Sequence, residues 1–285
     1  MTVDSKSFGD AIMSRPYHLF KYNQNESDNF TVIAHRGASA YYPENTIISF
    51  EGAISIGADM VELDVQLTSD GEVVVFHDEK IRRCTGRRGR IADYTLAQLK
   101  ELDAGSWFNK KYQGAKIPTL EEVLNLCRDK IAVNIEIKTE AVTEVVSGGI
   151  EEKSLKIVGQ SKMREHVIFS SFDPRALQHL KQIDSSTAIA VLFERKHYGS
   201  KKPGAIIESL GADAFNCSVS ELNNKWLLDI KLNKIPVNIY TVDDENYMRR
   251  LIEAGISGIF TNKPDILKKV AADITEKGKT GSGRI

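Results

Sequence analysis

Cysteine is scarce in this sequence of 285 residues, and its three copies, Cys84, Cys127 and Cys217, are far apart. None of them belongs to a C-x-x-C pair. An odd number of widely spaced cysteines predicts neither a disulfide framework nor a zinc site. We therefore expect three small buried side chains in a protein of a reducing compartment.

Long apolar segments are missing as well. Residues 1–29 are polar and mixed in charge, without the apolar core of a signal peptide, and no later run is long enough to span a bilayer. These absences predict a cytoplasmic protein with no integral membrane segment.

Neither sign of charge dominates the composition. The chain has 38 Lys and Arg against 39 Asp and Glu, which gives a formal net charge of -1. Proteins that bind nucleic acid usually carry a basic patch or stripe, so no nucleic-acid partner is expected. A hydrophobic share of 41% is typical of a soluble globular protein.

Short β-branched segments alternate with amphipathic helical segments between residues 30 and 275. Eight repeats of a strand and a helix favour one closed TIM (β/α)8 barrel over an open doubly wound sheet, and the G-x-G-x-x-G turn of nucleotide-binding sheets is absent. The predicted strands are 31–34, 60–64, 131–138, 167–171, 187–193, 214–217, 237–242 and 258–261. The clearest helices are 46–56, 120–127, 174–183 and 245–253.

One connection departs from the regular alternation. After Asp64 the apolar pattern continues, turns at 69–71 and returns through 73–77, which predicts a β-hairpin. A turn centred near Asp70 and Gly71 pairs His77 approximately with Asp64, so the hairpin is expected to bring this histidine close to the barrel mouth.

Three further segments are assigned by composition. Residues 79–116 are polar, basic and aromatic, and they are too long for a simple barrel loop, so we expect a small inserted subdomain over the C-terminal face. Residues 1–29 are expected to form an irregular lead-in. Residues 276–285 are Gly-rich and are expected to form a flexible tail.

Carboxylates recur on one face of two predicted strands. Glu62 and Asp64 are two residues apart, and Asn134, Glu136 and Lys138 follow the same spacing. Polar side chains in a strand that is otherwise fit for a buried parallel sheet cost several kcal/mol if unpaired, which suggests a functional site. Three carboxylates suit a hard divalent ion, Mg²⁺ or Ca²⁺, better than zinc. The alternative is a salt-bridge network inside the barrel.

Two histidines and two cations complete the candidate site. His35 and Arg36 end the first strand, at the face where barrel enzymes place their chemistry. With three carboxylates left for the metal, His35 and His77 are free to act as acid and base, and Arg36 and Lys138 can neutralise a phosphoryl group. A purely structural role for His35 remains the alternative.

Six ordered runs resemble the glycerophosphodiester phosphodiesterase family. Together they cover about residues 30 to 270, and the ordered set is highly specific although each run alone is weak. The runs are 35–46 (HRGASAYYPENT), 61–66 (VELDVQ), 75–78 (VFHD), 134–138 (NIEIK), 170–174 (SSFDP) and 258–262 (GIFTN).

The resemblance implies a TIM barrel with an inserted subdomain and a role for each matching position. The family's metal ligands correspond to Glu62, Asp64 and Glu136. Its acid and base histidines correspond to His35 and His77, and its phosphate-binding positions to Arg36 and Lys138. Tyr240 stands where many members carry Trp and, with Phe172, is a candidate wall of the substrate pocket.

The expected reaction is metal-dependent hydrolysis of a small-molecule glycerophosphodiester to glycerol 3-phosphate and an alcohol. Two alternatives remain at this stage: a lysophospholipase D-type lipid phosphodiesterase with an apolar entrance at Trp107 and Phe108, and a non-catalytic barrel that binds a phosphorylated ligand. The sequence leaves open the metal, the head group, the nucleophile, the oligomeric state and which histidine is the acid. His166, His179 and His197 are expected to be structural or solvated.

Overall fold

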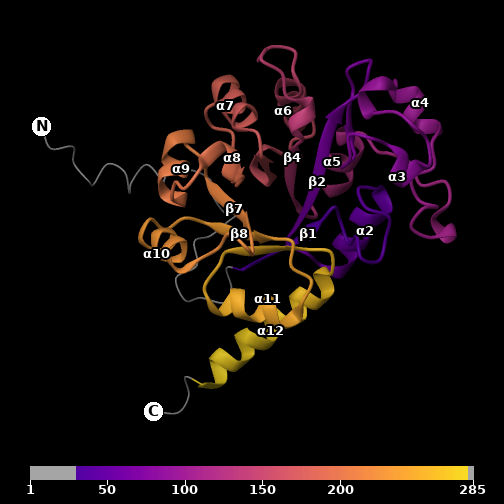
Figure 1. Ribbon diagram of the computed structural model, residues 1–285. Helices are drawn as coiled ribbons and strands as arrows, with labels where there is room; N and C mark the ends of the chain where they lie inside the picture. The colour runs from indigo at the N-terminus through magenta and orange to yellow at the C-terminus, as the bar shows by residue number, and fades with distance from the viewer. Residues whose placement is uncertain (1–29, 282–285) are drawn as a thin grey trace, which may run out of the picture.

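A closed barrel of eight parallel strands forms the centre of the computed structural model, which describes residues 30–281 (Figure 1). The first and second strands pair with each other, so the sheet has no open parallel edge and the predicted TIM barrel is confirmed. In order around the barrel the strands are β1 (Thr31–His35), β2 (Met60–Leu67), β4 (Ala132–Ile137), β5 (Val167–Ser171), β6 (Ile189–Leu192), β7 (Ala214–Ser218), β8 (Val237–Tyr240) and β9 (Gly258–Thr261).

Helices cover the outside of the barrel (Figure 1). They begin at residues that the sequence marks as caps: Thr46 accepts a hydrogen bond from the Ser49 amide, Thr119 forms a capping box with Glu122, and Asp173 precedes Pro174. The helices are α2 (Ile47–Ile56), α5 (Leu120–Cys127), α6 (Ile150–Gln160), α7 (Pro174–Ile183), α8 (Arg195–Tyr198), α9 (Pro203–Leu210), α10 (Asn224–Leu232), α11 (Glu245–Glu253) and α12 (Pro264–Gly281).

Both faces of the barrel strands are buried, and successive side chains point alternately to the outside and to the inside of the barrel. Val61, Leu63 and Val65 of β2 point outward into the large apolar core beneath the helices. Met60 points inward and joins a smaller cluster with Ile33, Ile168, Ala190, Ala214 and Phe260, which fills the lower part of the barrel. The inward positions that follow Met60 along β2 are Glu62 and Asp64, so the polar site begins directly above this apolar plug.

A hairpin follows the acidic pair. Strand β3 (Val73–Val75) runs antiparallel to β2, with Val75 opposite Val65. Continuing this register places Phe76 opposite Asp64, and the Phe76 amide donates to the Asp64 carbonyl at 2.9 Å. The approximate pairing of His77 with Asp64 was therefore wrong by one residue, because the turn is not centred where the sequence count placed it. The strand also ends at Val75, earlier than the predicted residue 77.

The segment after the hairpin packs around an apolar cluster of its own. It contains α3 (Arg82–Thr85), α4 (Leu96–Glu101) and the 3-10 helices η2 (Ile91–Asp93) and η3 (Lys110–Tyr112). The cluster joins Val74 and Phe76 of the hairpin to buried side chains of this segment, namely Ile81, Cys84, Ile91, Leu99 and Ala104, and to Ile117 directly after it. We call residues 79–116 the lobe; it lies beside β2 and α5, outside the ring of helices (Figure 1).

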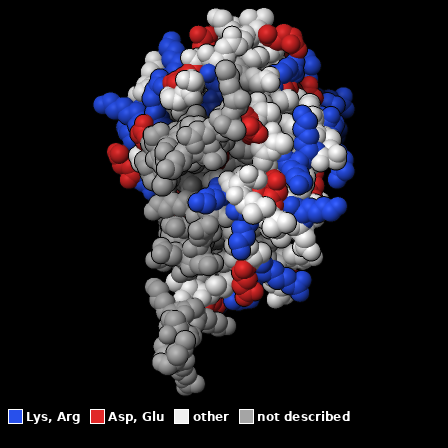
Figure 2. Space-filling model, turned by 90° about the vertical axis from the view of Figure 1, so that its left-hand side faces the viewer, with Lys and Arg blue, Asp and Glu red and all other residues white. Residues whose placement is uncertain are grey.

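Several features lie away from the barrel mouth. Helix α12 continues to Gly281, into the segment 276–285 that was expected to be a flexible tail, whereas the expected lead-in 1–29 lies outside the described residues. All three cysteines are free and buried, as predicted. In the part of the chain that the structure describes, no helix has the length and apolar character needed to cross a bilayer. Basic and acidic side chains are interspersed over the face next to α9 and α10 (Figure 2).

Candidate active site

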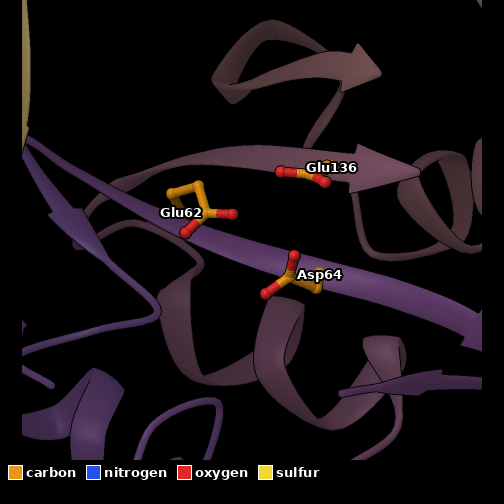
Figure 3. Close-up of side chains that lie close together, drawn as sticks. All are labelled: Glu62, Asp64 and Glu136. Carbon is orange, nitrogen blue, oxygen red and sulfur yellow. The ribbon is translucent and has the colours of Figure 1, made fainter. Parts of the chain in front are cut away.

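Three carboxylates from two neighbouring strands converge (Figure 3). Glu62 and Asp64 come from β2 and Glu136 from β4, where Asp64 pairs in register with Glu136. One oxygen of each lies within 4.8 Å of the others. Glu62 and Asp64 are only 2% and 1% exposed, so neither charge is screened by bulk water.

The pKa values of these three carboxyl groups are shifted in different directions. Burial raises the pKa of Glu62 well above its ordinary value of 4.5, and repulsion from Asp64 and Glu136 adds to the rise. Burial also raises the pKa of Glu136, although the Lys138 ammonium offsets part of this rise. For Asp64 burial is outweighed, because Lys138 and Arg36 hold the pKa of this carboxyl below its usual range.

The salt-bridge network considered from the sequence is present in part. Lys138 Nζ lies 2.8 Å from Glu136 Oε1 and 3.3 Å from Asp64 Oδ1, and Arg36 Nε lies 3.5 Å from Asp64 Oδ2. Arg36 is also shared with Glu44 at 2.9 Å. Two cationic side chains therefore face three carboxyl groups, two of them buried and one partly buried, so acidic groups outnumber basic ones in the cluster.

The donor set of this cluster fits a divalent cation. Asp64 Oδ2 accepts a hydrogen bond from Asn45 Nδ2 at 2.8 Å, but Asp64 Oδ1 is buried and accepts none. The Lys138 ammonium, 3.3 Å away, is the cation that faces this acceptor, so Oδ1 by itself does not require a metal. Oxygen donors alone, with no thiolate or imidazole among them, suit Mg²⁺ or Ca²⁺.

A left-handed turn after β1 holds Arg36 against the cluster. Arg36 has φ +56° and Gly37 φ +82°. A Cβ atom at Gly37 would lie 2.4 Å from Ser49 Oγ and 2.7 Å from the Ser49 carbonyl oxygen, so only glycine fits there. The turn aims the Arg36 amide at Glu62 Oε2, to which it donates at 2.9 Å.

His35 is oriented by an amide whose own orientation is fixed. Asn262, directly after β9, donates from Nδ2 to Asp243 Oδ2 at 2.6 Å and therefore presents Oδ1 to His35 Nδ1, 2.7 Å away. His35 Nδ1 must carry the proton of this bond, which leaves Nε2 as an acceptor. Burial, reinforced by the neighbouring Arg36 guanidinium, lowers the pKa of His35 from 6.5 to about 4.

His77 is oriented by a carboxylate instead. Its Nδ1 lies 2.7 Å from Asp78 Oδ1, and the Arg83 guanidinium donates to both oxygens of Asp78 at 2.7 and 3.0 Å. Arg83 in turn binds Glu44 through two nitrogens at 2.7 and 2.8 Å. The His77 side chain is 30% exposed, so it is far more accessible to solvent than the carboxylate cluster.

The predicted site residues meet around one cavity of about 190 Å³. All of them line it except Asp64, which lies behind Lys138 and Asn45. Phe172 and Tyr240 form one wall with their rings edge to face, 5.9 Å apart, and the Tyr240 hydroxyl donates to the Phe193 carbonyl at 3.2 Å. The remaining lining residues are Asn134, Leu192, Thr241 and Phe260.

Sequence reasoning missed the residues that orient the histidines. Asn262 was quoted only as part of a run, and Asp243 and Asp78 were not singled out, although each follows a strand. Asn45, directly before the helix cap Thr46, was quoted only as part of a run as well, and it donates to Asp64.

His166, His179 and His197 lie outside the cavity. His179 pairs with the buried Glu151 at 3.0 Å between α7 and α6. His166 belongs to the 3-10 helix η5 (Arg164–His166) before β5, and His197 to α8.

Comparison with known proteins gives one consistent family. Residues 35–266 match the model of the glycerophosphoryl diester phosphodiesterase family. The chain is 37% identical over 268 residues to a glycerophosphodiester phosphodiesterase of Bacillus subtilis, covering 88% of this chain and 89% of the relative. It is 40% identical over 237 residues to one of Caldanaerobacter subterraneus, covering 83% of this chain and 95% of the relative.

A solved structure gives the same result. The phosphodiesterase of Oleispira antarctica, solved in complex with its product sn-glycerol-3-phosphate, superposes with a TM-score of 0.77 at 30% identity. The match covers 87% of this chain and 98% of that structure. A glycerophosphoryl diester phosphodiesterase structure from Silicibacter pomeroyi, at 22% identity and a TM-score of 0.78, shows the same fold over 86% of this chain and 94% of the other.

Proposed function

Because the chain belongs to the glycerophosphoryl diester phosphodiesterase family and is an enzyme of that activity, we propose that it cleaves glycerophosphodiesters with a divalent cation and two histidines. The products are sn-glycerol 3-phosphate and an alcohol. The observation that carries this proposal is the convergence of the carboxylate cluster and both imidazoles on one cavity.

Glu62, Asp64 and Glu136 would hold the cation, Mg²⁺ or Ca²⁺. When bound, it supplies Lewis-acid polarisation of a phosphoryl oxygen. Arg36 and Lys138 line the cavity beside the cluster and stabilise the negative charge that builds up on the phosphoryl group in the transition state. Arg36 and Lys138 would therefore both contact the phosphoryl group of the substrate.

The hydrogen-bond partners of the two imidazoles favour different roles. An amide oxygen holds His35 with a free lone pair on Nε2, and no carboxylate of residues 30–281 forms an ion pair with its ring to stabilise an imidazolium, so His35 is the base. The carboxylate of Asp78 contacts His77 Nδ1 and stabilises an imidazolium, so His77 is the acid. His35 Nε2 takes the proton of the nucleophile, which is water or the neighbouring hydroxyl of the glycerol. The oxygen of the nucleophile bonds to phosphorus while the phosphorus–oxygen bond to the alcohol breaks, and His77 protonates the departing oxygen. If the glycerol hydroxyl attacks, a water molecule then opens the cyclic phosphate to give sn-glycerol 3-phosphate.

The two alternatives fit the geometry less well. A lysophospholipase D would place an acylated glycerol in the cavity, but about 190 Å³ is below the roughly 300–1,000 Å³ of pockets for larger ligands. Trp107 does not line the cavity; its ring stacks with Arg83 at 5.3 Å. A barrel that only binds phosphate has no use for two oriented imidazoles above a carboxylate cluster.

Release of sn-glycerol 3-phosphate from a panel of glycerophosphodiesters tests the proposal. We expect turnover with Mg²⁺ or Ca²⁺ and a large loss in His35→Ala and in His77→Ala, with His166→Ala as a matched histidine control at the opposite end of the barrel. Absence of turnover by the metal-supplemented wild-type protein on every diester would contradict the proposal, as would full activity of both histidine variants.

A further inference from the structure

A wide groove opens beside the closed cavity and shares two residues with it. Its volume is about 800 Å³, and His77 and Lys138 line both spaces. The rest of its lining comes from the beginning of the lobe and from the loop after β4: Asp78, Glu79, Lys80, Arg82, Arg83 and Glu140. We call this space the lobe groove; its lining contains the imidazole of His77 but no Phe, Tyr or Trp.

Most of the charged side chains in the lobe groove are already paired. Asp78 binds His77 and Arg83, as described above. Lys138 binds Glu136, and Glu79 lies 3.7 Å from Arg90.

Three charges in the groove have no such partner. Among the described residues, the exposed side chains of Lys80 and Arg82 form no ion pair or hydrogen bond, and Glu140 has none either. Two unpaired cations therefore face one unpaired anion. The groove also lacks the aromatic faces on which quaternary ammonium groups are bound.

We propose that the lobe groove binds the leaving alcohol of the substrate, and that Lys80 and Arg82 select alcohols that carry a second anionic group such as a phosphate monoester. The inference rests on the proposed function, because an acid at His77 places the departing oxygen on the side of the cavity where the groove opens. Glycerol and the reacting phosphate then occupy the small closed cavity, and the variable half of the diester extends over the lobe.

Two substrates that release the same product measure this selection. Glycerophosphoinositol and glycerophosphoinositol 4-phosphate differ by one phosphate on the leaving alcohol, and both yield sn-glycerol 3-phosphate. In the wild-type protein we expect kcat/KM to be several-fold higher for the phosphorylated substrate. In the double variant Lys80→Gln with Arg82→Gln this ratio should fall about five- to tenfold, as expected for two exposed charges.

Two controls separate the groove from the general charge of the lobe. The double variant Arg87→Gln with Arg88→Gln removes two exposed lobe cations that do not line the groove, so the ratio should stay within about twofold of the wild-type value. Glu140→Gln removes the one unpaired anion and should raise the ratio. An equal fall in both double variants would overturn the proposal, as would a wild-type preference for glycerophosphocholine over the phosphorylated substrate.

Calorimetric binding of the same two diesters in chelator separates this inference from the proposed function. If the phosphorylated diester binds more tightly and loses that advantage in the Lys80→Gln, Arg82→Gln variant, the groove assignment holds even without turnover, and only the proposed function fails. If turnover is present but neither kcat/KM nor affinity depends on Lys80 and Arg82, the groove assignment is wrong.

Discussion

Replacing Glu62 by Gln is expected to stabilise the metal-free protein while abolishing its activity. Glu62 faces two carboxylates at no more than 4.8 Å, and two unit charges at that distance repel by about 3 kcal/mol at an effective dielectric constant of 20. The hydrogen bond from the Arg36 amide and the Arg36 charge offset part of this repulsion. We expect a net gain of about 1–3 kcal/mol, or a rise in melting temperature of roughly 3–8 °C.

The stability gained in Glu62→Gln relative to the wild type should increase as the pH rises. The pKa of Glu62 is raised in the folded protein, so the unfolded chain releases this proton first as the pH rises. The folded wild-type protein therefore loses stability as the pH rises above the ordinary value of 4.5, whereas the Gln variant does not lose this contribution. Thermal unfolding in chelator should show little difference between the two proteins near pH 4 and a difference that grows from there to pH 8.

Asp64→Asn is the matched control with the opposite sign. Asp64 is the carboxylate that both Lys138 and Arg36 stabilise, so its loss removes one carboxylate partner from each cation, although Glu136 and Glu44 remain, and should cost about 1–3 kcal/mol. Added Mg²⁺ or Ca²⁺ should reverse the order of wild type and Glu62→Gln, because only the intact cluster gains the full binding energy. A metal-free Glu62→Gln protein that melts below the wild type at pH 8 would refute the reasoning and show a self-compensated salt-bridge network.

Three further outcomes follow from the site. Exhaustive chelation should abolish turnover and Mg²⁺ or Ca²⁺ should restore it; full activity in chelator contradicts the metal assignment. His77→Ala should lower turnover on natural diesters by about 10²–10⁴-fold but recover most of it on a nitrophenyl phosphodiester, whose leaving group needs no proton; recovery by His35→Ala instead would reverse the two roles. Because the pKa of His35 is about 4, kcat/KM should not fall on the acidic side until the pH is well below 6.5; a fall centred near 6.5 would exclude His35 as the base.

The sequence by itself determined the fold class and the composition of the cavity. The period-two spacing of Glu62 with Asp64, and of Asn134 with Glu136, requires these side chains to share a strand face. Regular alternation of strands and helices then favours a barrel, and a barrel brings all carboxyl strand ends to one mouth. The sequence therefore predicts that His35, at the end of the first strand, lies near the carboxylates.

The register of the hairpin could not be predicted from the sequence to the residue. Its register depends on the geometry of one turn, and a shift of a single residue placed Phe76 rather than His77 opposite Asp64. His77 still reaches the cavity, because the chain leaves the strand at Val75 and the lobe holds it through Asp78 and Arg83.

Only the tertiary structure decided which partners the site residues have. Asn262 and Asp243 are more than 200 residues from His35 along the chain, yet they fix the proton on its Nδ1. Closure of the barrel between β1 and β9 makes that contact, and no local pattern encodes it. Side-chain periodicity is a property of neighbouring residues and can be read from the sequence, whereas the hydrogen bonds that set a protonation state join strands that meet only when the sheet closes.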